Sequence, residues 1–238
     1  MTDPLSTPAP AHSAVLVHGA YADGSSWQDV IPLLLRAGLQ VAAVQNPLTS
    51  LADDVAATRR AIALVDPPTV LVGHSWAGTV ITEAGIDDRV SALVYIAARA
   101  PDAGEDYSAL AARFPMPPAT AGLVHTDGFA RLSEAAFIDD FANGIDAERA
   151  RVLYAVQGAI SDALFPSRTT VAAWRVRPTY YSVSTQDRTT APELERFLAQ
   201  RMQAQVIEID SGHLAMVSHP QDVARLILAA SARMREAE

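Results

Sequence analysis

Short, nearly continuous apolar runs recur along the chain and alternate with segments whose apolar residues return every three or four positions. In residues 51–65, for example, Val55 and Ile62 share one helical face, and Asp53 and Asp54 lie largely elsewhere. Runs without polar alternation are typical of parallel strands buried on both faces. The predicted strands are residues 13–17, 39–44, 69–72, 90–97, 179–183 and 206–209. The predicted helices are residues 25–36, 51–65, a segment ending near 84, 192–202 and 221–234.

This alternation of strands and helices predicts an α/β fold with a mostly parallel, doubly wound sheet. The alternation stops at Pro101 and resumes near residue 179, and the intervening segment carries several prolines and scattered aromatic residues. We expect a flexible tail at 1–12, a core formed by 13–100 and 179–238, and an inserted, mostly helical cap at 101–178. Within the cap, residues 132–142 and 147–156 have helical patterns. A run of ordinary connecting helices is the alternative interpretation of 101–178.

A serine follows the third predicted strand, in Gly73-His74-Ser75-Trp76-Ala77-Gly78. A strand, a tight turn with a serine at its apex, and a helix resemble the nucleophile elbow of α/β-hydrolases. Strand and helix nearly collide around such a serine, so the positions two before and two after it must be small. Gly73 and Ala77 meet this requirement, although the usual pattern has a second glycine where Ala77 stands. A buried turn with a helix-capping serine is the alternative.

Composition narrows the chemistry and the partners. The 238 residues carry a net charge of −9 and no basic run, which argues against nucleic acid and anionic membranes as partners. Cysteine is absent, so disulfides and thiol nucleophiles are excluded. All eighteen basic residues are arginine, which excludes Schiff-base chemistry on lysine and a phosphate-binding loop lysine. The N-terminus lacks the pattern of a signal peptide, and we expect a cytoplasmic protein without a membrane span.

A serine hydroxyl needs a base, and the base needs an orienting carboxylate. Parallel strands deliver their carboxyl ends to one edge of the sheet, so we sought both groups after the late strands. His213 follows the last predicted strand and is the candidate base. Asp187 follows the strand 179–183 and is the candidate acid, and a turn aspartate that caps the next helix is its alternative. Asp102 and Asp210 are the rival acids.

An acyl-transfer site also needs two backbone N–H groups to bind the oxyanion. The residue after the nucleophile, Trp76, is one candidate donor. Ala20, in the loop after the first strand, is the other, and Gly19 allows that backbone to approach the substrate. Tyr21 is a further candidate for substrate binding. A phosphate-binding loop is disfavoured at this position because no G-x-G-x-x-G follows the strand.

The ordered motifs resemble the α/β-hydrolase superfamily, and most closely bacterial relatives of the plant methylesterase and hydroxynitrile lyase family. They are the His18-Gly19 loop with Trp27 downstream, the serine turn, Thr185-Gln186-Asp187-Arg188 and Ser211-Gly212-His213. The resemblance covers roughly residues 13–100 and 178–234 and implies Ser75 as nucleophile, Asp187 as acid, His213 as base, and Ala20 and Trp76 as oxyanion donors. Lyases of this family use a lysine after the base and a threonine in the first loop. Leu214 and Gly19 stand there, so the resemblance implies ester hydrolysis.

The sequence therefore predicts a serine hydrolase that cleaves a small, mainly apolar carboxylic ester through an acyl-enzyme on Ser75. We expect the pocket under the cap, with Tyr21 and Trp76 as neighbours, and no cofactor or metal. The expected partner is a small-molecule ester, and a homodimer is left open. Three alternatives stay open: a ligand-binding or receptor-like relative with little turnover, a C–C bond hydrolase, and a cofactor-free oxygenase on the same three residues.

Overall fold

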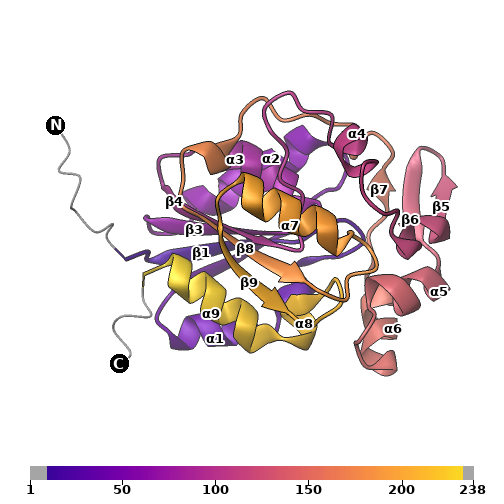
Figure 1. Cartoon of the computed structure of the whole chain (residues 1–238). Coiled ribbons are helices and arrows are strands. Elements are labelled where there is room, and N and C mark those ends of the chain that lie inside the picture. The colour runs from indigo at the N-terminus through magenta and orange to yellow at the C-terminus, as the bar shows by residue number, and fades with distance from the viewer. Residues whose placement is uncertain (1–9, 233–238) are drawn as a thin grey trace.

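The structure, a computed structural model, describes residues 10–232 and shows a six-stranded sheet between two layers of helices (Figure 1). Neighbouring strands run parallel in the order β2-β1-β3-β4-β8-β9, which confirms the predicted doubly wound α/β fold. β1 pairs with β2 on one side and β3 on the other, so the winding direction reverses there, and ligands of such sheets bind at this switch point. The strands are β1 (Ser13–Val17), β2 (Gln40–Val44), β3 (Thr69–His74), β4 (Val90–Ile96), β8 (Thr179–Ser184) and β9 (Gln205–Ile209).

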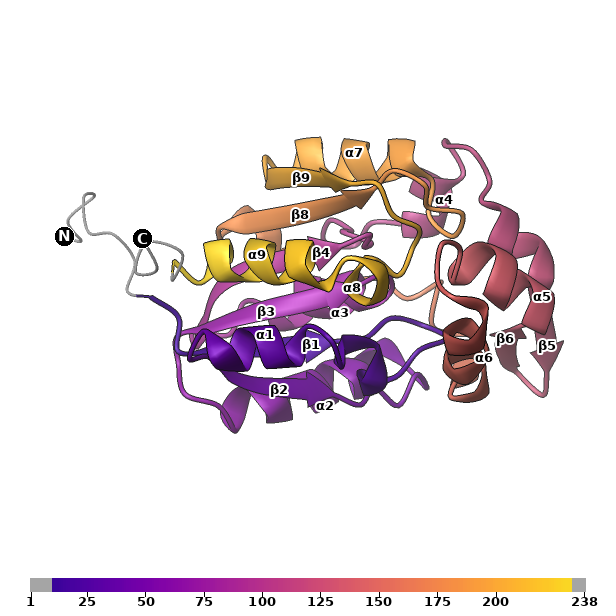
Figure 2. The same cartoon turned by 90° about the horizontal axis from the view of Figure 1, so that it is seen from below.

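Helices cover both faces of the sheet, as Figures 1 and 2 show from two directions. One face carries α1 (Ile31–Arg36), α8 (Ala215–Ser218) and α9 (Pro220–Ala230). The other carries α2 (Leu51–Ala63), α3 (Ala77–Ala84) and α7 (Pro192–Arg201). This double cover explains why the central strands are apolar at successive positions, because neither face meets water.

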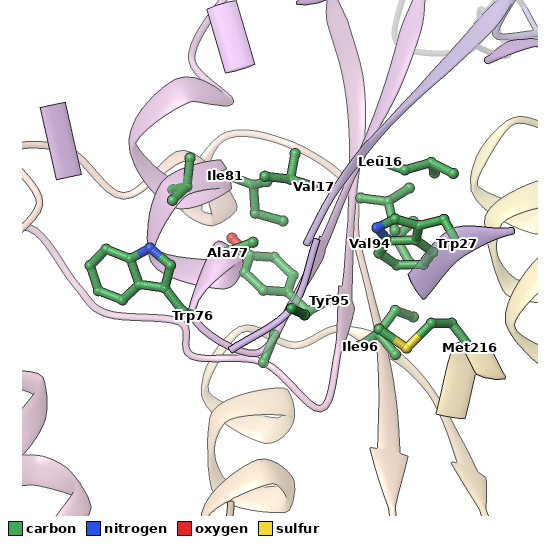
Figure 3. Close-up of a cluster of buried hydrophobic side chains, with 14 of the residues drawn as sticks. Leu16, Val17, Trp27, Trp76, Ala77, Ile81, Val94, Tyr95, Ile96 and Met216 are labelled. Carbon is green, nitrogen blue, oxygen red and sulfur yellow. The ribbon is translucent and has the colours of Figure 1, made fainter. Parts of the chain in front are cut away.

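The core lies on both sides of the central strands (Figure 3). Successive side chains of a strand point to opposite faces, so Val94 and Ile96 lie on one side of β4 and Tyr95 on the other. Tyr95 lies on the same side as Ile81 of α3. The side chains of Val94, Tyr95, Ile96 and Ile81 are all fully buried. The Tyr95 ring also stacks on that of Tyr181 in β8, with ring centroids 6.1 Å apart.

The segment 101–178 gathers mostly beyond the carboxyl ends of the strands (Figures 1 and 2). Its helical pieces are α4 (Tyr107–Ala111), η2 (Pro118–Gly122), α5 (Glu134–Ala136), η3 (Phe137–Phe141), α6 (Ala147–Ala155) and η4 (Ala173–Arg175). The strands β5 (Leu123–Thr126), β6 (Phe129–Leu132) and β7 (Ile160–Ser161) form a small antiparallel sheet that was not predicted. Asp127 and Gly128 join β5 to β6, both with positive φ, as a two-residue hairpin loop requires. The predicted boundaries of this insertion stay a prediction.

Two predicted helices are interrupted. Residues 25–36 form a short 3-10 turn, η1 (Gly24–Trp27), and then α1, which starts at Ile31 because Pro32 is tolerated only in a first turn. Residues 132–142 begin as strand, and the helix starts only after Ser133, whose hydroxyl accepts a hydrogen bond from the N–H of Ala136. It continues as the π-helical turn η3.

A few described residues lie before the first strand and after the last helix. Of the predicted tail 1–12, residues 1–9 lie outside the described residues. The backbone N–H groups of Ala11 and His12 donate to the carbonyls of Ser231 and Pro68. The last helix ends at Ala230, and the predicted end at residue 234 also lies outside the described residues. Within residues 10–232, none of the helices has the length and apolar character that crossing a membrane requires.

Candidate active site

Ser75 lies at the turn between β3 and α3, at the carboxyl edge of the sheet. Its φ of 53° is in the left-handed region, which a residue with a side chain occupies only under strain. Backbone hydrogen bonds hold it there: its N–H donates to the carbonyl of Ile96, and its carbonyl accepts from the N–H groups of Gly78 and Arg99. The serine is thus fixed by β4 and by the loop that follows it.

The small residues around Ser75 are required by close backbone approaches. A Cβ on Gly73 would lie 2.8 Å from the carbonyl oxygen of Ala77, so strand and helix touch here. A Cβ on Gly78 would lie 1.9 Å from the carbonyl oxygen of Arg99. Gly78 therefore leaves the space that the loop after β4 occupies. Ala77 stands where the usual motif has glycine, and it fits there fully buried.

The structure brings His213 and Asp187 together. His213 Nδ1 lies 2.6 Å from Asp187 Oδ2, and both side chains are fully buried. The other oxygen of Asp187 accepts hydrogen bonds from the backbone N–H groups of Thr189 and Thr190, at 2.6 and 2.8 Å. The carboxylate is therefore fixed by backbone donors while it orients the imidazole. His213 Nε2 has no hydrogen-bond partner among the described residues, so no hydrogen bond links it to Ser75 in this state.

The two rival carboxylates form hydrogen bonds with side chains other than His213. Asp102 pairs with the guanidinium of Arg175. Asp210 accepts hydrogen bonds from the side chains of Thr185 and Gln186. Neither contacts an imidazole, so of the three candidate acids Asp187 alone meets His213 within the described part of the chain.

A second histidine supports the first. His74 Nε2 lies 3.0 Å from the backbone carbonyl of His213, to which it donates, and the ring centroids are 4.6 Å apart. Burial, and then the nearby His213, hold the pKa of His74 well below its ordinary value. It is therefore neutral and positions the loop of His213. Phe141 of the insertion also contacts the His213 ring, at a centroid distance of 5.2 Å.

Glu195 is a buried acid that the sequence did not point to. Its side chain, on α7, is fully buried, Oε2 accepts from the backbone N–H of Ser184, and Oε1 has no partner among residues 10–232. Burial, and then the charge of Asp187, raise the pKa of Glu195 well above its ordinary 4.5. Folding therefore favours its protonated form, and this contribution to stability is lost as the pH rises from 4.5 through the raised pKa.

We accordingly expect Glu195→Gln, which cannot ionise, to gain stability relative to the wild type as the pH rises. Urea unfolding of both proteins between pH 5 and 8 measures the difference. Glu193→Gln changes an exposed carboxylate on the same helix and should track the wild type. A Glu195→Gln profile parallel to that of the wild type would contradict this assignment.

The loop after β1 approaches Ser75 from the neighbouring strand. His18 Nδ1 donates to the carbonyl of Gly19, and His18 Nε2 accepts from the N–H of Asn46, which fixes the loop. A Cβ on Gly19 would lie 2.8 Å from the Ser75 Cβ, so only glycine permits this approach. The backbone N–H groups of Ala20 and Trp76 make no hydrogen bond within the described residues. They are free donors beside the serine.

A hydrogen bond to the carboxylate of Asp54 holds the indole ring of Trp76 in place. Trp76 Nε1 donates to Asp54 Oδ2 at 2.8 Å, and Asp54 Oδ1 accepts from the N–H of Leu48 at the same distance. The prediction that Asp54 lies largely off the buried face of its helix was wrong, because it is fully buried. Its two hydrogen bonds compensate part of the cost of burying a carboxyl group.

Ser75, Trp76, Ala20 and Tyr21 line one cavity of about 340 Å³, and His213 and Asp187 do not reach its wall. Most of the remaining wall comes from the insertion, with further residues from the loop before α7 and from its first turn. It is mainly apolar and includes Pro115, Pro117, Leu123, Leu132, Phe165 and Leu194. Arg99 also lines it and was missed, although it lies three residues after the buried strand β4, at the edge where the candidate residues gather. Within residues 10–232, no group of three or more His, Asp or Glu side chains is arranged to hold a metal ion.

Comparison with known proteins places this geometry in a family. Residues 14–226 match the model of the Alpha/beta hydrolase family. Among solved structures, a polyneuridine aldehyde esterase superposes with a TM-score of 0.79 at 18% identity, over 92% of this chain and 99% of that one. The pyrethroid hydrolase PytH gives 0.76 at 18% identity over 94% and 98%, and an Arabidopsis methylesterase gives 0.75 at 18% identity over 92% and 99%. Among proteins of curated function, none matches by sequence. With a family match over most of its length and the same fold in these structures, the chain belongs to the α/β-hydrolase family.

Proposed function

We propose that the protein is a serine hydrolase that cleaves a small, mainly apolar carboxylic ester through an acyl-enzyme on Ser75. The hydrogen bond between His213 and Asp187, at the same sheet edge as the strained Ser75, carries this proposal. The related solved structures named above include an esterase, a methylesterase and a pyrethroid hydrolase, which supports ester cleavage. The apolar cavity beside Ser75 supports an apolar substrate of modest size.

In the proposed reaction, Ser75 Oγ attacks the ester carbonyl while His213 Nε2 takes the hydroxyl proton. Asp187 holds the Nδ1–H tautomer and stabilises the imidazolium that forms. The free N–H groups of Ala20 and Trp76 bind the oxyanion. His213 then gives the proton to the leaving alcohol. In the second half of the reaction it takes a proton from the attacking water and returns it to Ser75 Oγ as the carboxylic acid product leaves. The Ser75–His213 hydrogen bond, absent here, is expected to form with substrate, as catalytic contacts often tighten on binding.

The test is turnover of p-nitrophenyl esters with acyl chains of two to eight carbons. We expect wild-type protein to release p-nitrophenol from the shorter members and to lose activity once the acyl chain exceeds the cavity. The matched p-nitroanilides should react far more slowly, because the amide leaving group is poorer. Binding of the esters without turnover would favour the receptor-like alternative and contradict the proposal.

A further inference from the structure

The cavity beside Ser75 contains an arginine with no acidic partner. Arg99 is the charged residue of its wall, and the wall includes no Asp or Glu. Elsewhere in the described chain arginines such as Arg175, Arg188 and Arg201 pair with carboxylates, whereas Arg99 forms no ion pair with any described residue. A cation held away from water is costly unless it is paired. The missing counter-charge is therefore a property of the cavity that needs an explanation.

The backbone of Arg99 is fixed to the nucleophile. The N–H of Arg99 donates to the carbonyl of Ser75 at 3.0 Å. The absence of a side chain at Gly78 leaves room for the carbonyl of Arg99. The preceding residue, Ala98, is held by the Tyr181 hydroxyl, which accepts from its N–H at 3.0 Å and donates to its carbonyl at 2.7 Å. Hydrogen bonds thus tie the backbone that carries the guanidinium to the serine turn and to β8.

Aromatic rings fix the guanidinium itself. Its central carbon lies 4.1 Å from the ring centroid of Tyr107, 5.1 Å from that of Phe165 and 5.3 Å from that of Trp76. The three rings surround the guanidinium and stabilise its charge through cation–π contacts. One Nη donates to the carbonyl of Phe165 at a long 3.3 Å, and Nε has no partner in residues 10–232. Burial lowers the pKa of Arg99 to about 10, which still leaves it protonated at neutral pH.

We propose that the substrate carries a carboxylate, in addition to the ester, and that Arg99 binds it. This inference rests on the proposed function and refines its substrate class to a mainly apolar ester with one anionic group. A carboxylate matches the planar fork of the guanidinium and its single positive charge. The bound carboxylate would therefore supply the counter-charge that Arg99 lacks. The apolar wall holds the rest of the molecule. The net charge of −9 does not attract anions at long range, so the preference arises inside the cavity.

Two matched substrate pairs test this, one for each side of the ester. The first is the mono-p-nitrophenyl ester of adipic acid against its carboxamide, and the second is the butyrate of 4-hydroxybenzoate against that of 4-hydroxybenzamide. In at least one pair we expect kcat/KM of wild-type protein to favour the anionic member by about 10- to 100-fold. Equal rates in both pairs would overturn the inference.

Variants assign the preference to Arg99. Arg99→Gln should bring the anionic-to-neutral ratio close to one, chiefly through KM, and Arg99→Lys should keep part of it because it retains charge but not the fork. Arg225→Gln removes an exposed arginine on α9 and should keep the wild-type ratio. A ratio unchanged in Arg99→Gln overturns the inference. If that variant fails to fold, the wild-type ratio and Arg99→Lys decide.

A binding measurement separates this inference from the proposed function. Titration calorimetry of Ser75→Ala protein compares 4-phenylbutyrate with 4-phenylbutanamide, with and without Arg99→Lys. Selective binding of the carboxylate that weakens in Arg99→Lys supports the anion site even if no ester is hydrolysed. Ester hydrolysis without charge preference, together with no carboxylate binding, leaves the proposed function standing and overturns the anion site.

Discussion

Replacement of Ser75 by alanine is expected to lower kcat for the best ester on the order of 10⁴- to 10⁶-fold. The hydroxyl supplies the electron pair that forms the acyl-enzyme, so its removal leaves no group to form that bond. Because nucleophile and base act as a unit, His213→Ala and the double variant should retain about the same residual rate as Ser75→Ala. Steady-state kinetics of the three variants measures this.

Two control variants accompany that series. Ser167→Ala removes an exposed hydroxyl that donates to the carbonyl of Ala163, and His219→Ala removes a partly exposed imidazole that contacts Ser218. Both should keep near wild-type rates. Multiplicative losses in the double variant, instead of the common residual rate, would show that Ser75 and His213 act in separate steps and would contradict their assigned roles.

The second large effect is on stability. A methyl group on Gly78 would lie 1.9 Å from the backbone oxygen of Arg99, and that backbone is held by its hydrogen bond to Ser75. Gly78→Ala is therefore expected to reduce the free energy of unfolding by about 3 kcal/mol. In a chain of this size such a loss lowers Tm by about 6–12 °C.

Thermal unfolding followed by circular dichroism measures that loss. Gly158→Ala is the matched control, because a Cβ there would meet only the flexible end of Leu48, at 3.4 Å. Its Tm should stay within a few degrees of the wild-type value. A Gly78→Ala protein with wild-type Tm would mean that the loop after β4 can move away from the serine turn. Such a result would also contradict the fixed position of Arg99 in that loop.

The sheet was predictable because its central strands are buried on both faces. Apolar runs such as residues 90–97 leave few alternatives to a central parallel strand, and the observed β4 spans Val90–Ile96. The contact between Asp187 and His213 followed from the same principle, since both come after parallel strands and must meet at one edge. The chemistry proposed for them stays a prediction.

The insertion was harder to predict because its elements are short and its apolar residues lack a clear period. The Asp127-Gly128 pair is a known hairpin signal, and it was the one cue to the strands on either side. Leu132 comes to the cavity wall from the end of the short strand β6 and Phe165 from irregular backbone, so sequence periodicity could not place them there.

Two buried carboxyl groups and one half-buried guanidinium also escaped prediction, for a common reason. Asp54, Arg99 and Glu195 look like surface residues when the sequence is read alone. Each is held by partners distant in sequence: the indole of Trp76 for Asp54, the rings of Phe165 and Trp76 for Arg99, and the N–H of Ser184 for Glu195. Only the folded chain brings those partners together.

The account depends most on an activated hydroxyl at Ser75, and covalent labelling measures this directly. Folded wild-type protein treated with a fluorophosphonate should gain one adduct, which peptide mass spectrometry places on Ser75. His213→Ala should label far more slowly, because the serine has lost its base. Absence of an adduct, or an adduct on a different residue, under conditions that label a known serine hydrolase would contradict the account.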